Sequence, residues 1–553
     1  MIASAARPSL EGKQFDIVVI GGGINGVAIA RECACAGRSV LLIEQNDFAS
    51  GTTSRSTRII HGGLRYLQYA EIGLVRESLR ERDCLVRERP HLVRPLRFVL
   101  ALDGGSRVSA LQVRAGLWLY GKLAGSHWST QNHRAAARQL EAQLDSGRAW
   151  SIFEYDDAQC EFPERLVAEW VSDAAAAGAA ICNYCMVLDV VQTQGRVTGV
   201  VCRDRLSGQE CSVLCNWVIN ATGPWVDQLC ADASVPTGGR LIGGVRGSHL
   251  VLPRFADAPE AALYTQGIDG RAIFVVPWNN QVLLGTTEVP DSSDPAAVAP
   301  SAAEVEYLLL SANRLFPQAA LGAADVHYAF AGIRPLPFVE GAAPSAITRK
   351  AILYDHKQDG VAGMISVIGG KLTTAASLAR RCAQALGIHP QPTSEALVPV
   401  TSANGIDATV RQWANAIAGR TGVHPNLALQ TASLYGPNAL PILRMAASDE
   451  RFLQPLCPHT HHVVAEAVHG LRFEYAVTLA DILLRRVPVA LGACWSADCT
   501  RMAATRIGTA LGWDESEIEW QIETAEIERV AFLKKPEPTP VPRDASSTVH
   551  RLA

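Results

Sequence analysis

Short apolar runs alternate with helical segments at the start of the chain. Residues 15–20 form an apolar run typical of a buried parallel strand, and glycines follow it directly. Small residues over 27–36 predict a helix that Gly37 can end. A second apolar run, 39–43, predicts the next parallel strand. This order predicts the opening strand–turn–helix–strand unit of an α/β domain.

Farther along, the pattern changes to strands and then to helices. Alternating residues at 186–204 predict a hairpin with its turn near 194–196. More strand-like runs occur between 216 and 288 and predict an inserted antiparallel sheet. After about residue 395 the pattern is mostly helical, and residues 465–486 predict one amphipathic helix. The proline-rich residues 534–553 predict an extended, disordered tail.

The glycines after the first strand have the spacing of a dinucleotide-binding fingerprint. Gly21 permits a tight turn, Gly23 lets backbone approach a pyrophosphate, and Gly26 allows close packing of helix and strand. The following helix N-terminus favours phosphates because its N–H groups are free. Glu44 ends the second strand, where it can accept hydrogen bonds from a ribose. We therefore predict a bound dinucleotide.

Size, charge and hydropathy narrow the class of protein. The 553 residues suggest several domains, and the net charge of −4 argues against general nucleic-acid binding. No apolar run approaches the roughly 18 residues of a membrane span, and the first residues lack a signal-peptide core. The 14 cysteines are scattered, which favours reduced, mostly buried thiols in a cytoplasmic protein.

Three later features favour FAD over NAD. A second glycine-bearing strand end, which includes Thr222 and Gly223, can pass close to the same dinucleotide. The polar stretch 51–67, which includes Ser54, is long enough to run beneath a pyrophosphate and a flavin ring. Finally, residues 369–374 open a helix whose N–H groups could face the flavin edge that becomes anionic on reduction. This last segment contributes Gly370, Lys371, Leu372 and Thr373.

Several motifs together resemble a known family. GGGINGVAIA, SRSTRIIHGGLRYL, VINATGPWVD, GSHLVLP, AGIRPLP and GGKLTTAASLA occur in this order. They resemble the FAD-dependent glycerol-3-phosphate dehydrogenases, strongly over 14–390 and more weakly beyond. The sequence departs from the family pattern at Glu288, where Asp is more usual, and at Val487, where Thr is more usual.

The resemblance implies an α/β FAD-binding Rossmann-type domain with an inserted antiparallel-sheet substrate (cap) domain and a helical C-terminal domain. We expect the FAD-binding domain at 14–90, 160–235 and 325–390, and the cap at 91–159 and 236–324. The helical domain is expected at 395–530. The resemblance also implies glycerol 3-phosphate as substrate, a quinone as electron acceptor, peripheral attachment to the cytoplasmic face of the inner membrane, and a possible homodimer.

Oxidation of an alcohol phosphate requires a phosphate site, a base and a hydride acceptor. Arg65 and Arg334 are the candidates for binding the phosphate, because guanidinium groups bind dianions bidentately. Lys371 stands at a helix start, where a cation opposes the helix dipole. Such an unfavourable position invites a functional explanation: Lys371 could stabilise an alkoxide or the reduced flavin. His61 is a possible base, His249 is its rival, and either could serve only as a structural hydrogen-bonding group.

Two other clusters receive no metal assignment. Cys182 and Cys185 form an isolated CxxC pair at a strand start. Cys457 precedes a group of histidines that is interpreted as solvated or capping side chains: His459, His461, His462 and His469. The segment 111–123 carries Trp118 and Lys122, a mixture that suits either an interfacial or a buried helix.

Three alternatives stay open. A glycerol-3-phosphate oxidase would have the same pocket but use oxygen. An amine or amino-acid oxidase would need a carboxylate clamp. A flavin-binding protein without turnover would have little use for a cationic pocket.

Overall fold

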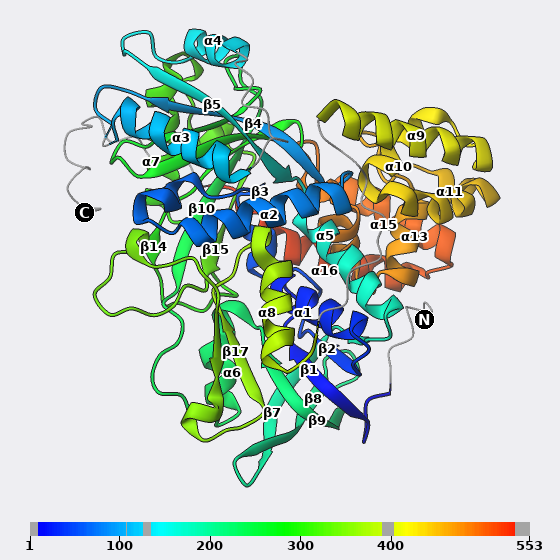
Figure 1. The fold of residues 1–553 in the computed structure, drawn as a ribbon. Helices are drawn as coiled ribbons and strands as arrows, with labels where there is room; N and C mark the ends of the chain where they lie inside the picture. The colour runs from blue at the N-terminus through cyan, green and yellow to red at the C-terminus, as the bar shows by residue number, and fades with distance from the viewer. Residues whose placement is uncertain (1–8, 107, 125–133, 390–402, 537–553) are drawn as a thin grey trace.

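Figure 1 shows two sheets stacked one above the other, with a group of helices beside them. The computed structural model describes residues 9–106, 108–124, 134–389 and 403–536. The first sheet and its helices occupy the lower part of the view, the second sheet the upper part, and the C-terminal helices lie to the right. This arrangement agrees with the expected fold class.

The first sheet has a parallel centre in which β9, β1 and β2 lie side by side. Ile20 at the end of β1 is in register with Ile43 on one side and with Asn220 on the other. The carboxyl ends of the three strands therefore meet at one edge, as in dinucleotide-binding folds. In sheet order the strands are β16 (Ile352–Asp355), β17 (Met364–Ile368), β9 (Glu210–Asn220), β1 (Gln14–Ile20), β2 (Val40–Ile43) and β6 (Ala180–Cys182).

Two features predicted for this sheet are confirmed. The hairpin is formed by β7 (Cys185–Thr193) and β8 (Arg196–Asp204), and β8 then pairs with β9. Helix α1 (Ile24–Cys35) follows the glycine turn and packs against α8 (Ala375–Ala385) and α5 (Pro163–Ala176). Small apolar residues on α1 allow these close contacts and bury its face against the sheet.

The second sheet differs in two ways from the predicted inserted sheet. It is mixed, because β11 pairs in parallel with β4. It also recruits β3 and β15 from segments that we expected in the FAD-binding domain. Both are buried strands. The backbone of β3 pairs with β5, and that of β15 pairs with β10 and, at Ala329, with Lys534. Its strands are β3 (Ile59–Ile60), β4 (Val93–Leu102), β5 (Ser151–Cys160), β10 (Val245–Leu252), β11 (Ala262–Gln266), β12 (Ala272–Trp278), β13 (Gln281–Gly285), β14 (Val289–Pro290) and β15 (Tyr328–Arg334).

Helices cover this second sheet. Ser301 caps α7, since its hydroxyl accepts from the backbone N–H of Glu304 while the Glu304 carboxylate accepts from the Ser301 N–H. The helices around the two sheets are α2 (Ile72–Glu88), α3 (Ala110–Ala124), α4 (Arg134–Gln143), α6 (Val226–Asp232) and α7 (Ala302–Leu315).

The prediction of one amphipathic helix over 465–486 is wrong. Helix α13 ends at Phe473, and Tyr475 takes a left-handed φ of 59°. Thr478 then caps a new helix, because its hydroxyl accepts from the N–H of Asp481. The C-terminal helices are α9 (Ala403–Thr421), α10 (Pro425–Tyr435), α11 (Ala439–Ser448), α12 (Glu450–Leu453), α13 (Val464–Phe473), α14 (Leu479–Asp481), a π-helical turn (Ile482–Arg486), α15 (Ala497–Leu511) and α16 (Glu515–Phe532).

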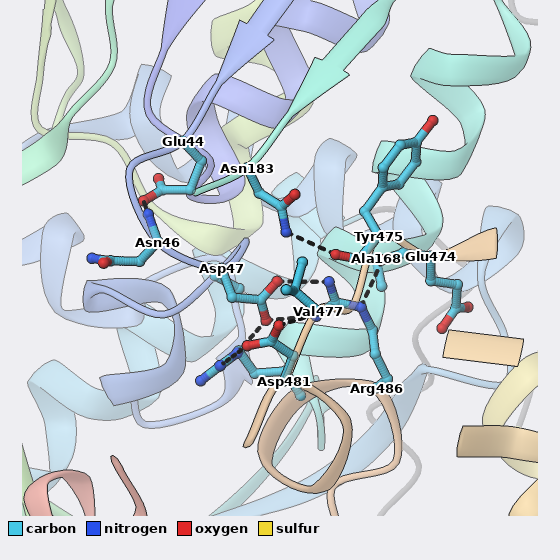
Figure 2. Close-up of polar contacts among 12 residues, drawn as sticks. Glu44, Asn46, Asp47, Ala168, Asn183, Glu474, Tyr475, Val477, Asp481 and Arg486 are labelled. Carbon is cyan, nitrogen blue, oxygen red and sulfur yellow. Dashed lines mark hydrogen bonds and ion pairs between the residues drawn. The ribbon is translucent and has the colours of Figure 1, made fainter. Parts of the chain in front are cut away.

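A buried ion-pair network attaches these helices to the first sheet. Figure 2 shows Arg486 facing Asp47, which lies just after β2. Arg486 donates to both carboxylate oxygens of Asp47 at 2.7 Å, and Arg485 donates to Asp47 and Asp481. Asn183 donates to the carbonyl of Tyr475 at 2.7 Å, which adds a second link beside the first.

The start of the predicted tail is ordered. Lys534 exchanges two backbone hydrogen bonds with Ala329 of β15, at 2.7 and 2.8 Å. The expected disorder is therefore wrong at this residue, because the chain extends the edge of the second sheet there. Residues 537–553 lie outside the described part of the chain.

Candidate cofactor and substrate site

A cavity of about 1000 Å³ lies where the first sheet ends and the second sheet begins. Its wall includes nearly all residues that the sequence singled out. These are Gly21, Gly23, Glu44, Ser54, His61, Arg65, Thr222, Gly223, His249, Arg334, Gly370, Lys371, Leu372 and Thr373. Gly26 lies behind the wall, where α1 meets the glycine turn.

The glycine turn needs glycine for two separate reasons. Gly21 has a φ of 111°, and a side chain there would also meet the Ala221 carbonyl oxygen at 2.6 Å. A side chain at Gly26 would lie 1.9 Å from the carbonyl oxygen of Gly21. Gly23 is different, because a methyl group there would meet only the Thr53 hydroxyl, at 3.4 Å. Gly23 therefore faces open space in the cavity.

Glu44 closes one end of the cavity. Its carboxylate accepts from the backbone N–H of Gly22 at 2.6 Å and from that of Asn46 at 2.8 Å. Burial raises the pKa of Glu44, whereas these two hydrogen bonds oppose the rise. The carboxylate is thus fixed beside the glycine turn, in a position suited to receive hydroxyl groups of a ligand.

The glycine turn and the segment 369–374 are joined directly. The Asn25 side chain donates to the carbonyl of Gly369 at 3.2 Å, while its Oδ1 is buried without a hydrogen-bond partner in the described protein. Gly370 has a φ of 95°, and a side chain there would strike the Asn25 amide at 2.4 Å. The helix that we expected at Lys371 starts later, because a 3₁₀ turn (Leu372–Thr374) precedes α8.

Other polar side chains around the turn are already engaged. The Ser54 hydroxyl donates to the carbonyl of Ala49 at 2.5 Å. The Thr222 hydroxyl donates to the Asn220 side chain at 2.6 Å. These two residues present backbone rather than a free hydroxyl to the cavity.

Lys371 points into the space between α2 and the cavity. Its ammonium group donates to the Ser78 hydroxyl at 2.8 Å and lies 4.6 Å from the centre of the Tyr66 ring. Burial lowers the pKa of Lys371 to about 8 from its ordinary 10.5. Tyr66 provides a cation–π contact, which partly replaces the lost hydration.

Three arginines gather around Glu288. Arg65 lies 3.5 Å from the Glu288 carboxylate and Arg349 lies 2.9 Å from it. Arg334 donates to the Thr286 hydroxyl and to the Thr287 carbonyl, at 2.7 and 3.1 Å. Burial, with Arg349 next in effect, lowers the pKa of Arg334 to about 10. Positive charge thus exceeds negative charge in this part of the cavity.

Arg349 is a site residue that the sequence did not reveal. It follows a loop with no glycine motif, so only its spatial approach to Glu288 identifies it. Its Nη1 is buried without a hydrogen-bond partner in the described protein. An unsatisfied buried guanidinium nitrogen is costly unless a ligand supplies an acceptor.

Both candidate histidines are held neutral. Burial, aided by Lys371, lowers the pKa of His61 to about 3. Burial, aided by Arg334, lowers the pKa of His249 to about 3. His249 exchanges a 2.8 Å hydrogen bond with Thr57, whereas its Nδ1 has no partner in the described protein. Each imidazole is therefore uncharged at neutral pH and is a weaker base than a solvent-exposed histidine.

The C-terminal helices also line the cavity, which the sequence did not predict. Arg485 reaches it from the π-helical turn, and Thr524, Glu528 and Phe532 reach it from α16. Phe532 lies 4.7 Å below the guanidinium of Arg55, which donates to the carbonyl of Gly51 at 3.0 Å. The C-terminal region thus completes one wall of the site.

The cysteine pair and the histidine cluster have separate surroundings. Cys182 and Cys185 are buried on β6 and β7, and Cys185 contributes to the cavity wall. His462 binds Glu466 at 2.8 Å, and His469 packs edge-on against Tyr435. Cys457 and His459, however, meet Cys499 from a distant helix.

Helix α3 exposes two large apolar side chains. Leu111 is 75% exposed and Trp118 is 66% exposed. Within the described residues, no helix is both long enough and apolar enough to cross a membrane.

Comparison with known proteins agrees with this geometry. The sequence profile of the family described as FAD dependent oxidoreductase matches residues 16–385. A second profile, the C-terminal domain of alpha-glycerophosphate oxidase, matches residues 365–518.

Characterised relatives cover most of the chain. A glycerol-3-phosphate dehydrogenase of Synechocystis is 38% identical over 88% of this chain and 90% of its own length. A D-erythritol 1-phosphate dehydrogenase of Brucella abortus is 34% identical, over 86% of this chain and 94% of its own. The crystal structure of glycerol-3-phosphate dehydrogenase from Bacillus halodurans, complexed with FAD, superposes with a TM-score of 0.74 at 25% identity. It covers 96% of this chain and 97% of that one.

The cavity suits FAD. It is long enough to extend from Glu44, through the glycine turn, to the segment around Lys371. The unpartnered Asn25 Oδ1 and the open space above Gly23 lie along this path. Gly21, Gly23 and Glu44 would hold the adenosine and pyrophosphate half, and Gly370 to Thr373 the flavin half.

Gly23→Ala should weaken FAD binding without disturbing the fold. The new methyl group meets no protein atom closer than 3.4 Å, yet it takes space that the pyrophosphate needs. We expect at least tenfold weaker binding, about 1.4 kcal/mol. Flavin absorbance per chain and titration of the apoprotein with FAD measure this effect. Gly116→Ala on α3, where a methyl group meets nothing within 4 Å, is the matched control. Equal FAD affinity in both variants would contradict the assignment.

Proposed function

Because this chain belongs to the FAD-dependent oxidoreductases of the glycerol-3-phosphate dehydrogenase family, we propose that it oxidises sn-glycerol 3-phosphate to dihydroxyacetone phosphate. We also propose that it passes the electrons to a quinone. The observation that carries this proposal is the cationic group beside Glu288. It combines three arginines with Lys371 in one buried pocket, and a buried nitrogen of Arg349 has no partner in the described protein.

A phosphate dianion matches this pocket in charge and shape. Clustered buried cations destabilise a protein unless anions compensate them. Arg65, Arg334 and Arg349 can together offer several N–H donors to phosphate oxygens, in the fork geometry that guanidinium groups provide. An uncharged polyol would leave the same donors unsatisfied. The pocket therefore favours a phosphorylated substrate over glycerol.

The proton of the substrate hydroxyl needs an acceptor inside the pocket. His61 and His249 both line the cavity in the uncharged form, which has a nitrogen lone pair to receive the proton, although the lowered pKa of each makes this transfer less favourable. The Nδ1 atom of His249 has no hydrogen-bond partner in the described protein, which supports His249 as the base. His61 lies near Lys371 and contacts Phe274 edge-on, which supports His61. When bound, FAD supplies the acceptor for the hydride that leaves the carbon bearing this hydroxyl.

Lys371 is suited to stabilise developing negative charge. Its ammonium group is desolvated, and a cation in a low-dielectric pocket attracts an anion more strongly than it would in water. We infer that it acts on the alkoxide-like oxygen or on the flavin edge, separately from phosphate binding.

Two observations support quinone as the acceptor. Relatives of this chain are named as glycerol-3-phosphate dehydrogenases, one of them the aerobic enzyme of Escherichia coli, which is 37% identical over 69% of this chain. The exposed Leu111 and Trp118 on α3 give the chain an apolar surface of the kind that enters a membrane interface. Oxygen is the alternative acceptor.

Anaerobic reduction of the bound flavin tests the proposal directly. sn-Glycerol 3-phosphate should bleach the flavin absorption band, and D-erythritol 1-phosphate should act more weakly. The reduced protein should then reoxidise faster with a soluble quinone than with air. Bleaching by an amino acid but not by glycerol 3-phosphate would overturn the substrate assignment. Stoichiometric peroxide at a rate matching quinone reduction would identify an oxidase.

Arg334→Met or Arg65→Met should lower kcat/KM for glycerol 3-phosphate. A lost charged hydrogen bond is worth roughly 1.5–3 kcal/mol, or about 10- to 150-fold. The same variants should change kcat/KM for glycerol much less, because that substrate has no phosphate. Arg203→Met, which removes an exposed ion pair with Glu210, is the control. Equal losses on both substrates would show that the arginines do not bind phosphate.

The rate of flavin reduction at saturating substrate should fall as the pH rises through about 8. The ammonium form of Lys371 exists below its pKa, so its stabilising charge is lost on the alkaline side. The histidines titrate near pH 3 and contribute nothing in this range. Stopped-flow measurements between pH 7 and 9.5 avoid the phosphate ionisation near pH 6.

Lys371→Met provides the check on this profile. It should be slower at pH 7 and should not show the alkaline decline, while Lys371→Arg should keep a positive charge across the whole range. Flavin content must be equal in the variants compared. If Lys371→Met keeps both the wild-type rate and the wild-type profile, Lys371 has no role in the chemistry.

A further inference from the structure

A short hairpin between α12 and α13 presents two potential metal ligands at its tip. The backbone N–H of Leu456 donates to the carbonyl of His462 at 2.8 Å, and that of Val464 donates to Gln454 at 2.9 Å. Between them, the chain turns tightly from Cys457 to Thr460. This turn brings the side chains of Cys457 and His459 to the same side.

A third potential ligand comes from a helix 40 residues later in the chain. Cys499 lies in the first turn of α15, which Ser496 caps by accepting from the backbone N–H of Cys499. The sulfur of Cys499 is 3.7 Å from Nδ1 of His459. The two sulfurs and this nitrogen all lie within 4.8 Å of one another.

These spacings approach those of a tetrahedral zinc site. Bonds of about 2.3 Å to sulfur and about 2.0 Å to nitrogen place two such ligand atoms roughly 3.6 Å apart, close to the observed sulfur–nitrogen distance. Two thiolates and a neutral imidazole balance the charge of Zn²⁺, and a further thiolate ligand would give the half-buried site a net charge of −1.

We propose that Cys457, His459 and Cys499 bind a structural Zn²⁺ ion, with Cys494 as the fourth ligand. Cys494 is exposed five residues before Cys499, and its carbonyl lies 3.6 Å from the Cys499 sulfur. Sulfur and imidazole ligands select zinc over magnesium or calcium, which prefer oxygen. In the sequence, Cys457 and His459 stand together in a group interpreted as solvated or capping side chains, whereas Cys499 lies 40 residues beyond His459.

The ion would fasten the hairpin to α15 and act at a distance from the cavity. Cys457, His459 and Cys499 are absent from the residues that line the cavity. Helix α15 packs against α13 and α16, and α16 contributes Thr524 and Glu528 to the cavity wall. The metal therefore stabilises the C-terminal helices rather than taking part in the chemistry.

Metal analysis of the FAD-loaded protein is the first test. After growth with added zinc and dialysis against a weak chelator, we expect about one zinc per chain. His459→Asn should lose it, whereas His461→Asn, two residues away and exposed, should retain it. Cys499→Ser should lose it and Cys84→Ser, an exposed thiol on α2, should retain it. Flavin content and circular dichroism show that each variant is folded. Absence of zinc from the wild type, or zinc retained in His459→Asn and Cys499→Ser alike, would overturn the proposal.

Cobalt substitution identifies the ligands without relying on activity. Co²⁺ in place of zinc should give a thiolate-to-metal absorption band in the near ultraviolet, weaker in Cys494→Ser and absent in Cys457→Ser. Absence of this band from the wild type would contradict thiolate ligation.

Titration of thiols in denaturant without reductant tests whether a disulfide forms instead of the metal site. All 14 cysteines should react once the metal is removed. Two fewer, traced by peptide mass analysis to Cys457 and Cys499 rather than to the neighbouring pair Cys202 and Cys211, would reveal a competing disulfide and overturn the proposal.

Discussion

The carboxylate of Asp47 fixes the position of the C-terminal helices on the nucleotide-binding sheet. It is fully buried, and it pairs with Arg486 at 2.7 Å and with Arg485. Burial alone would raise the pKa of Asp47, but the two arginines lower it. Removing one partner would leave a buried charge uncompensated, which typically costs about 3–5 kcal/mol. This loss is a large fraction of the free energy of unfolding of a typical domain. Because Arg485 and α16 line the cavity, this network also completes the site (Figure 2).

The end of the cavity beside Glu288 differs from the Asp47 network, because its positive charges are not balanced by carboxylates. Arg65, Arg334 and Arg349 approach a single region beside Glu288, and burial removes the water that would otherwise screen them. Such a pocket is costly when empty of anions and favourable when a dianion enters. The clustered cations that select an anionic ligand therefore also destabilise the pocket when no anion is bound. The histidines nearby are neutral, since burial disfavours imidazolium and nearby cations add to the effect, Lys371 at His61 and Arg334 at His249.

The two sheets contribute different parts of the cavity wall. The ends of β1, β2 and β9 bring the glycine turn, Glu44 and Thr222 together at one edge of the first sheet. The second sheet brings His249 from β10 and Arg334 from β15, and these strands are adjacent. The hydrogen bond from Asn25 to Gly369 ties the turn after β1 to the segment carrying Lys371. Cofactor and substrate groups are thus held in one rigid arrangement.

The sequence by itself determined the features that depend on local spacing. The glycine turn with Glu44 and the β7–β8 hairpin follow from backbone requirements of a few consecutive residues. Only the tertiary structure decided which strands share a sheet, as for β3 and β15, and where the predicted 465–486 helix breaks, at Tyr475. It alone brought Arg349 to Glu288 and Cys499 to His459. These contacts join residues tens to hundreds of positions apart. Register and packing set such approaches, and neither leaves a periodic signal in the chain.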